Sequence, residues 1–83
     1  MAQSKEQIRS WIVEYLATLV GVPKGEVDTT LRFEEYGIDS TASVGLSGAL
    51  ADWLGVHFEA NLTKEHPTID AVTAFVATQI GLA

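Results

Sequence analysis

Apolar residues near the start of the chain recur at three- and four-residue steps, as they do along one face of an amphipathic helix. The series is Ile8, Trp11, Ile12, Tyr15, Leu16 and Leu19. Ser4 followed by Gln7 resembles a capping box, and Gly21 and Pro23 are typical helix stop signals. The pattern predicts a helix from about residue 5 to residue 20.

A second helix is predicted over residues 40–54. Asp39 or Ser40 supplies its N-cap, and Gly55 closes its end. The stripe expected to face the core is Leu46, Leu50, Trp53 and Leu54. Another face, at the same helical spacing, carries Thr41, Val44 and Gly48.

Two glycines, Gly45 and Gly48, are unusual in the interior of this helix. Each costs about 1 kcal/mol relative to alanine in a helix interior. Two explanations are open at this point. The glycines permit close packing against a neighbouring helix, or they keep one face flat so that another molecule can approach the backbone.

The rest of the chain predicts one more long helix and a short one. Thr68 is the expected N-cap of the long helix, and the residues of its apolar stripe are Ile69, Val72, Phe75, Val76 and Ile80. A short element is expected around residues 63–66. No strand pattern competes, so the expected fold is all-α, a small bundle of three main helices plus one short helix.

A long connection, residues 22–39, separates the first two helices. It contains many turn formers, and loops of this length tend to be functional. Leu31, Phe33 and Tyr36 are expected to pin it to the core. Trp11 and Trp53, on the apolar stripes of their helices, are expected to be core residues.

Composition narrows the possible functions. The 83 residues allow one domain, expected to span 1–83. The net charge of −6 disfavours binding to nucleic acid or to acidic membranes, because both need basic residues. No apolar run is long enough to span a membrane, and the N-terminus has no secretory signal pattern. The absence of cysteine fits a cytoplasmic protein, and a small acidic bundle is expected to be a monomer.

The acidity is concentrated in the middle of the chain. Residues 26–59 hold seven of the eleven acidic residues and one of the five basic residues. This is either a solvated segment that keeps the protein soluble or an electrostatic docking face.

The candidate chemistry is centred on Ser40, which ends the segment Gly37-Ile38-Asp39-Ser40. Its hydroxyl is expected at a helix N-terminus, where free backbone N–H groups and the helix dipole favour a phosphate. The alternative is a serine that only caps the helix. A Ser-His-Asp hydrolase built on Ser40, His66 and Asp39 is disfavoured, because no G-x-S-x-G elbow is present. His57 and His66 lack a third ligand, so no metal site is expected.

The same segment resembles the attachment motif of phosphopantetheine carrier domains, the acyl and peptidyl carrier proteins. The resemblance covers nearly the whole chain. It also rests on Leu31, Phe33-Glu34-Glu35-Tyr36, Leu46, Leu50, Leu54-Gly55 and Pro67-Thr68-Ile69. It implies a non-catalytic acyl carrier. A phosphopantetheinyl transferase would attach 4'-phosphopantetheine from coenzyme A to Ser40, beside Asp39, and the arm would hold acyl groups as thioesters.

In such domains the second helix and the loop before it usually meet the partner enzymes. In this chain the corresponding residues are Phe33, Glu34, Glu35, Ile38, Thr41, Val44, Gly45 and Gly48. Thr41 replaces a larger aliphatic residue of the family, and Gly45 stands where stand-alone fatty-acid carriers often have an acidic residue. These departures favour a specialised pathway, with docking through the loop and apolar contacts.

The second helix carries the run Val44-Gly45-Leu46-Ser47-Gly48 followed by Asp52-Trp53-Leu54-Gly55. This run is most similar to carriers of polyketide synthases, in particular carriers loaded by fatty acyl-AMP ligases. The implied partners are therefore a transferase, such an acyl-loading enzyme, and a ketosynthase or other synthase domains. A peptidyl carrier of non-ribosomal peptide synthesis is the alternative within the family. An alternative from another class is a helical protein-interaction module without a prosthetic group.

Overall fold

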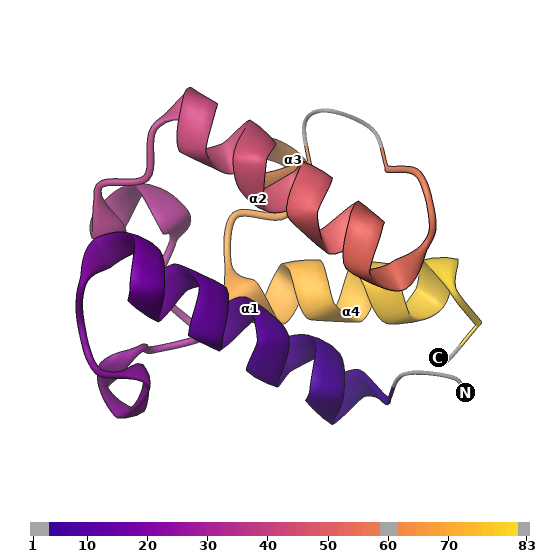
Figure 1. The fold of residues 1–83 in the computed structure, drawn as a ribbon, viewed down its shortest axis with the longest axis horizontal. Helices are drawn as coiled ribbons and strands as arrows, with labels where there is room; N and C mark the ends of the chain where they lie inside the picture. Colours follow the sequence, from indigo (N-terminus) through magenta and orange to yellow (C-terminus); the bar gives the residue numbers. More distant parts are fainter. Residues whose placement is uncertain (1–3, 59–61, 82–83) are drawn as a thin grey trace.

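The computed structural model describes residues 4–58 and 62–81, and it is helical throughout (Figure 1). In these ranges the α-helices are α1 (Lys5–Val20), α2 (Ser40–Leu54), α3 (Leu62–Glu65) and α4 (Ile69–Gln79). Two 3₁₀ helices, η1 (Lys24–Glu26) and η2 (Phe33–Tyr36), lie in the long connection between α1 and α2. The predicted all-α bundle of three main helices and one short helix is confirmed.

The ends of the long helices follow from local capping. Ser4 Oγ accepts a hydrogen bond from the Gln7 N–H at 3.1 Å, and Gln7 Oε1 accepts one from the Ser4 N–H at 2.8 Å, which completes the predicted capping box. Gly21 ends α1 with φ of 77°, a left-handed conformation that glycine adopts without strain. Thr68 caps α4 as predicted, since its Oγ1 accepts from the Ala71 N–H at 3.0 Å.

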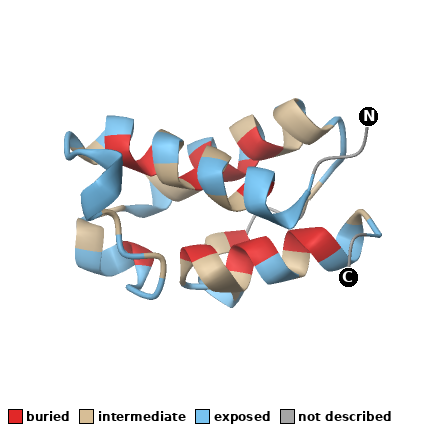
Figure 2. Cartoon of the chain, turned by 90° about the horizontal axis from the view of Figure 1, so that it is seen from below, coloured by how far each residue is buried: buried red, intermediate tan, exposed pale blue. Residues whose placement is uncertain are grey.

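The three long helices enclose one core, and their buried residues face inward (Figure 2). The members contributed by these helices are Ile8, Ile12, Leu16, Leu46, Leu50, Ile69, Val72 and Val76. One residue of the predicted stripes departs from this pattern. Leu19 is 46% exposed, because it lies in the last turn of α1, just before Gly21 ends the helix. Thr73 of α4, which the sequence analysis did not single out, is fully buried.

The two tryptophans are only partly buried, which corrects the expectation of two core residues. The Trp11 and Trp53 rings stack on each other with centroids 5.2 Å apart and planes 10° apart. Tyr15 extends the stack, with its ring centroid 5.4 Å from that of Trp11. The stack links α1 to the C-terminal half of α2 at the edge of the core.

The long connection is fixed to the start of α4. The Phe33 N–H donates to the Pro67 carbonyl at 2.8 Å, and the Asp70 N–H donates to the Thr29 carbonyl at 3.1 Å. Phe33 is 3% exposed and so pins the loop to the core as predicted, whereas Leu31 is 38% exposed. The Ile38 N–H donates to the Phe33 carbonyl at 3.3 Å, which links the end of the loop to this fixed point.

A local clamp shapes the middle of the same connection. The Tyr36 hydroxyl accepts from the Asp28 N–H at 2.7 Å and donates to the Asp28 carbonyl at 2.6 Å. Two hydrogen bonds from Thr30 lower the pKa of the Asp28 carboxyl below its ordinary value. The bond from the Thr30 hydroxyl has the larger effect, and the bond from the Thr30 N–H has the smaller one. These hydrogen bonds fix the backbone of a segment that is rich in turn-forming residues.

The short helix α3 is anchored on both sides. Leu62 at its start is 3% exposed, and the His66 ring, just after its end, stacks on Phe75 of α4 with centroids 4.2 Å apart. The short element predicted around residues 63–66 is confirmed, one residue earlier than expected. None of the helices in the described ranges is long and apolar enough to cross a membrane.

Candidate functional site

Ser40 is the first residue of α2 and is exposed. Asp39, and not Ser40, is the N-cap, because its carboxylate accepts from the Ala42 N–H at 2.8 Å. Gly37, with φ of 79°, turns the chain between η2 and this cap. The Ser40 hydroxyl is therefore not used for capping, which removes the capping role as its explanation.

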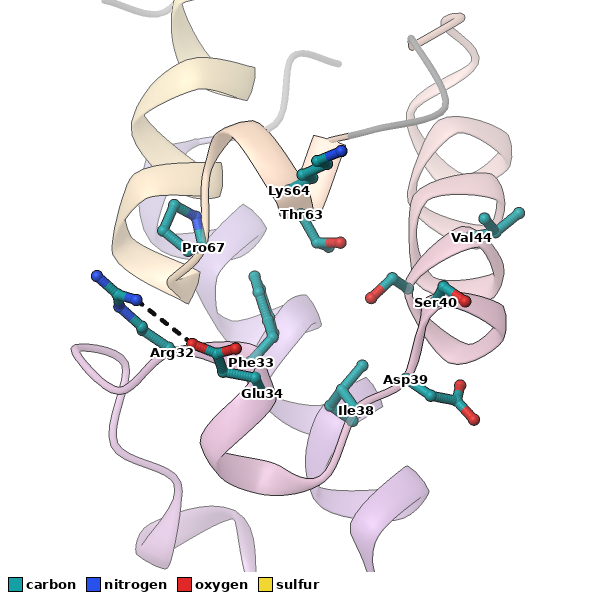
Figure 3. A pocket seen from close by; sticks show the side chains of 11 residues that line it. Arg32, Phe33, Glu34, Ile38, Asp39, Ser40, Val44, Thr63, Lys64 and Pro67 are labelled. Atoms are coloured by element: carbon teal, nitrogen blue, oxygen red, sulfur yellow. Dashed lines mark hydrogen bonds and ion pairs between the residues drawn. The ribbon is translucent and has the colours of Figure 1, made fainter.

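A pocket of about 560 Å³ opens in front of Ser40 (Figure 3). Three segments line it: the end of the long connection, the first turns of α2, and α3 with the residues that follow it. Its lining residues are Arg32, Phe33, Glu34, Ile38, Asp39, Ser40, Ser43, Val44, Thr63, Lys64 and Pro67. Pockets of roughly 300–1,000 Å³ are the size that holds small organic groups.

The charges around this pocket are mixed. Arg32 Nη1 pairs with Glu34 Oε1 at 3.3 Å, and both side chains are largely exposed. Asp39 is committed to the α2 N-terminus. Lys64 comes from α3, on the side of the pocket opposite α2 (Figure 3). The pocket thus combines an available hydroxyl, an acidic cap and a cation from a separate element.

The structure brings together four of the residues expected to meet partners. Glu34, Ile38 and Val44 surround the pocket with Phe33, whose ring is almost entirely buried and so offers a partner little surface. Glu35 is exposed, but its carboxylate accepts from the Arg32 N–H at 3.2 Å and so caps η2.

The remaining three expected docking residues lie elsewhere on α2. Thr41, Gly45 and Gly48 are exposed and do not line the Ser40 pocket. Gly48 lines a second pocket of about 330 Å³ farther along α2, which shares Val44 with the first. The outer face of α2 therefore runs from one pocket to the other through Val44.

Sequence reasoning missed the contribution of α3 to the site. Thr63, Lys64 and Pro67 lie more than twenty residues from Ser40 in sequence, and no motif connects them to it. The predicted short element around residues 63–66 was the only available signal, and it did not indicate which way its side chains face.

The rival chemistries find no support in the geometry. Within the described ranges no hydrogen bond joins Ser40 to His66, whose ring stacks on Phe75, and Asp39 caps a helix. His57 is exposed. In the same part of the chain, no group of three or more His, Cys, Asp or Glu side chains could hold a metal ion.

Comparison with known families gives a direct match. Residues 10–76 match the model of the phosphopantetheine attachment site. This chain is a phosphopantetheine carrier domain. Its family membership decides between a carrier and an interaction module without a prosthetic group, in favour of the carrier.

Similar proteins are themselves carriers or contain them. The carrier domain is 30% identical over 74 residues to the acyl carrier protein TtuC of Teredinibacter turnerae, covering 89% of this chain and 85% of that protein. It is 39% identical over 70 residues to one chain of the phenolphthiocerol/phthiocerol polyketide synthase of Mycobacterium tuberculosis. That match covers 84% of the carrier domain but only 4% of the synthase chain.

A solved structure of a peptidyl carrier protein has the same fold. The free-standing peptidyl carrier protein of Acinetobacter baumannii superposes on the carrier domain with a TM-score of 0.86 and 26% identity. The superposition covers 93% of this chain and 96% of that one. The fold alone therefore does not distinguish an acyl carrier from a peptidyl carrier.

The residues of the site fit the group that the family carries, a covalently attached 4'-phosphopantetheine. The fit rests on the exposed Ser40 at the start of α2, the adjoining pocket and the Lys64 cation that lines it. A phosphodiester is an anion, so a nearby cation suits it.

Proposed function

We propose that Ser40 is the residue that receives 4'-phosphopantetheine, and that the chain presents acyl groups to enzymes of polyketide or specialised fatty-acyl biosynthesis. The observation that carries the proposal is the exposed Ser40 hydroxyl, unused by the helix cap, at the mouth of a pocket. The match to the phosphopantetheine attachment site supports it.

The attachment step needs a phosphopantetheinyl transferase as the catalyst. The Ser40 oxygen would form a bond to the phosphorus of coenzyme A that bears the pantetheine, and the phosphoanhydride bond of coenzyme A would break. The nucleotide part leaves as a bisphosphate, and the serine proton passes to a base of the transferase or to water. The attached group supplies a flexible arm whose thiol holds acyl groups as thioesters.

The carrier domain itself contributes position and not catalysis. The fixed loop end and the Asp39 cap hold Ser40 at the start of a rigid helix, so the arm leaves from a defined point. Tethering raises the effective concentration of the cargo at a partner's active site. We expect a single domain over residues 1–83, monomeric and cytoplasmic, with Asp39 part of the site that a transferase recognises.

The partners would dock on the outer face of α2 and the loop end. Val44 is 56% exposed, and Thr41, Gly45, Gly48, Glu34 and Ile38 flank it. These residues offer a partner a mainly apolar surface with few charges. An acyl-loading enzyme such as a fatty acyl-AMP ligase and a ketosynthase or other synthase domain are the expected partners. The likeness to the mycobacterial polyketide synthase supports this class of pathway.

A peptidyl carrier of non-ribosomal peptide synthesis is the second candidate. It is favoured by the superposition on the Acinetobacter peptidyl carrier protein. The cargo distinguishes the two. An adenylation enzyme would load an aminoacyl group on a peptidyl carrier, whereas a fatty acyl-AMP ligase would load an acyl group on the carrier proposed here.

The intact mass of the protein tests the proposal directly. The chain is incubated with coenzyme A and a broad-specificity phosphopantetheinyl transferase, beside Ser40→Ala and Ser43→Ala. We expect one phosphopantetheinyl unit on the wild type and on Ser43→Ala, which alters a second serine of the same pocket, and none on Ser40→Ala. No gain on the wild type, with a control carrier modified in the same tube, would overturn the assignment.

A further inference from the structure

Lys64 is a basic residue of the pocket in front of Ser40, and no ion pair among the described residues involves it. Arg32, the other basic residue of the pocket, pairs with Glu34 at 3.3 Å. Lys64 has no carboxylate oxygen within ion-pair distance in residues 4–58 and 62–81. By contrast, Lys24 in the long connection pairs with Glu14 at 3.1 Å.

The N-terminus of α2 cannot supply the missing counter-charge for a phosphate on Ser40 by itself. Asp39 already places a carboxylate there and accepts the Ala42 N–H at 2.8 Å. A carboxylate at this position interacts favourably with the helix dipole and repels a second anion beside it. A phosphodiester on Ser40 therefore gains most from a cation that another element supplies.

The fold holds α3 in the place from which it can supply that cation. Leu62 buries the start of the helix, and the His66–Phe75 stack fixes the chain just after its end. Thr63 and Lys64 lie between these two anchors and line the pocket from the side opposite α2. Figure 3 shows the Thr63 side chain directed across the pocket toward α2.

We propose that Lys64 is the positioning residue for the phosphopantetheine phosphate, with the Thr63 hydroxyl as an additional hydrogen-bond donor. The long, flexible lysine stem lets its ammonium reach a phosphate oxygen and act as a point charge. The pair ties the modified Ser40 to α3 and directs the first part of the arm into the pocket between α2 and α3. This inference rests on the proposed modification of Ser40.

The three lysines of the chain make a direct test possible. Reductive dimethylation with ¹³C labels Lys5, Lys24, Lys64 and the N-terminal amine, and methylation preserves the positive charge of the lysines. Spectra are recorded before and after the transferase reaction, on protein whose mass confirms the modification. We expect the Lys64 methyl signal to shift on modification, whereas Lys5 and Lys24 serve as internal controls and stay in place.

Salt and substitution show whether the shift reports an ion pair. At about 1 M salt, where the Debye length is about 3 Å, the Lys64 shift should fall by at least half. On unlabelled lysines, the ¹⁵N amide signals of Thr63, Lys64 and Glu65 should move on modification. Lys64→Gln should reduce the movement at Thr63 and Glu65 at least twofold, Lys64→Arg should retain it, and Lys5→Gln should not change it.

Two results would overturn the inference. One is an unshifted Lys64 signal in protein that carries the modification, and the other is an undiminished amide response in Lys64→Gln. A transferase reaction that adds no mass contradicts the proposed function as well, and the mass, read before the spectra, separates the two failures. Circular dichroism of Lys64→Gln checks that this exposed substitution leaves the fold intact.

Discussion

The two faces of α2 obey different physical requirements. Leu46 and Leu50 on the inner face are 1% and 0% exposed and lie in the core, whereas Val44 on the outer face is 56% exposed. Burial of an apolar side chain stabilises the fold by roughly 1.5–3 kcal/mol, so the inner residues are explained by stability. The outer residues are not, and this difference indicates where to look for a partner.

The glycines of the outer face make the contrast sharper. A Cβ added at Gly48 would meet nothing within 4 Å, and one added at Gly45 would meet only the Tyr15 hydroxyl at an ordinary 3.6 Å. Close packing of a neighbouring helix, one of the two explanations open from the sequence, therefore does not require either glycine. The other explanation, a flat face that lets a molecule approach the backbone, supports the proposed docking surface.

The largest predicted effect compares one residue from each face. Leu50→Ala should destabilise the protein by about 2–5 kcal/mol, because it leaves a cavity in the core. Val44→Ala removes an exposed side chain and should change stability by about 0.5 kcal/mol or less. Urea denaturation followed by circular dichroism measures both variants. A loss for Val44→Ala as large as that for Leu50→Ala would contradict the distinction between the faces.

The buried faces of the helices could be predicted from the sequence, because their apolar residues recur at helical spacing. Hydrophobic spacing placed Ile8, Ile12 and Leu16 on one stripe, and the caps at Ser4 and Gly21 gave the ends of α1. Spacing failed where burial depends on what lies opposite. Leu19 lies beyond the core despite its periodic position.

Only half of the candidate site could be predicted from the sequence, for a related reason. The local segment around Ser40 carried a recognisable motif, and its position at the start of a helix followed from turn and cap signals. The pocket also needs Thr63, Lys64 and Pro67, which reach it only because α3 and the loop are packed together. Such contacts between distant segments leave no spacing pattern in a single sequence.

Substitution of Asp39, the N-cap from which both faces of α2 begin, is expected to have the next largest effect on stability. Asp39→Ala should cost about 1 kcal/mol, because the Ala42 N–H loses its acceptor. Asp39→Asn keeps an acceptor and should stay close to the wild type, since asparagine is an equally good N-cap residue. Thermal unfolding of the two variants measures this difference.

The same pair of variants separates capping from recognition. If a transferase modifies Asp39→Asn as fast as the wild type, Asp39 acts by positioning Ser40. A slow reaction on a stable Asp39→Asn protein shows instead that the transferase reads the carboxylate. Equal destabilisation by alanine and asparagine would contradict the capping role.

A smaller effect with an opposite sign is expected on the outer face. Gly48→Ala should stabilise the protein by about 0.5–1 kcal/mol, because alanine is the better helix former and its methyl group enters open space. The same methyl group should slow loading by the acylating enzyme. Gly25→Ala is the matched control, since it also fills open space but lies in η1, away from the outer face of α2.

The combination of the two readouts decides the role of Gly48. Greater stability with slower loading in Gly48→Ala, and unchanged loading in Gly25→Ala, fits a docking face that is kept flat. Greater stability of Gly48→Ala with unchanged loading would contradict docking at Gly48. It would then leave the presence of a glycine inside α2 without a functional explanation.

The smallest effect is expected from the modification itself. A phosphate on Ser40 is attracted by the helix dipole and by Lys64 and is repelled by Asp39, and an exposed ion pair contributes only about 0–1 kcal/mol. One kcal/mol moves the melting temperature of a domain this small by roughly 4–8 °C, so the apo and modified forms should melt within about 8 °C of each other. Calorimetry of both forms at low and high salt measures the shift, and salt should reduce it. A shift of more than about 10 °C would mean that the arm packs against the core, because solvent-exposed charges on one pocket cannot supply that much stability.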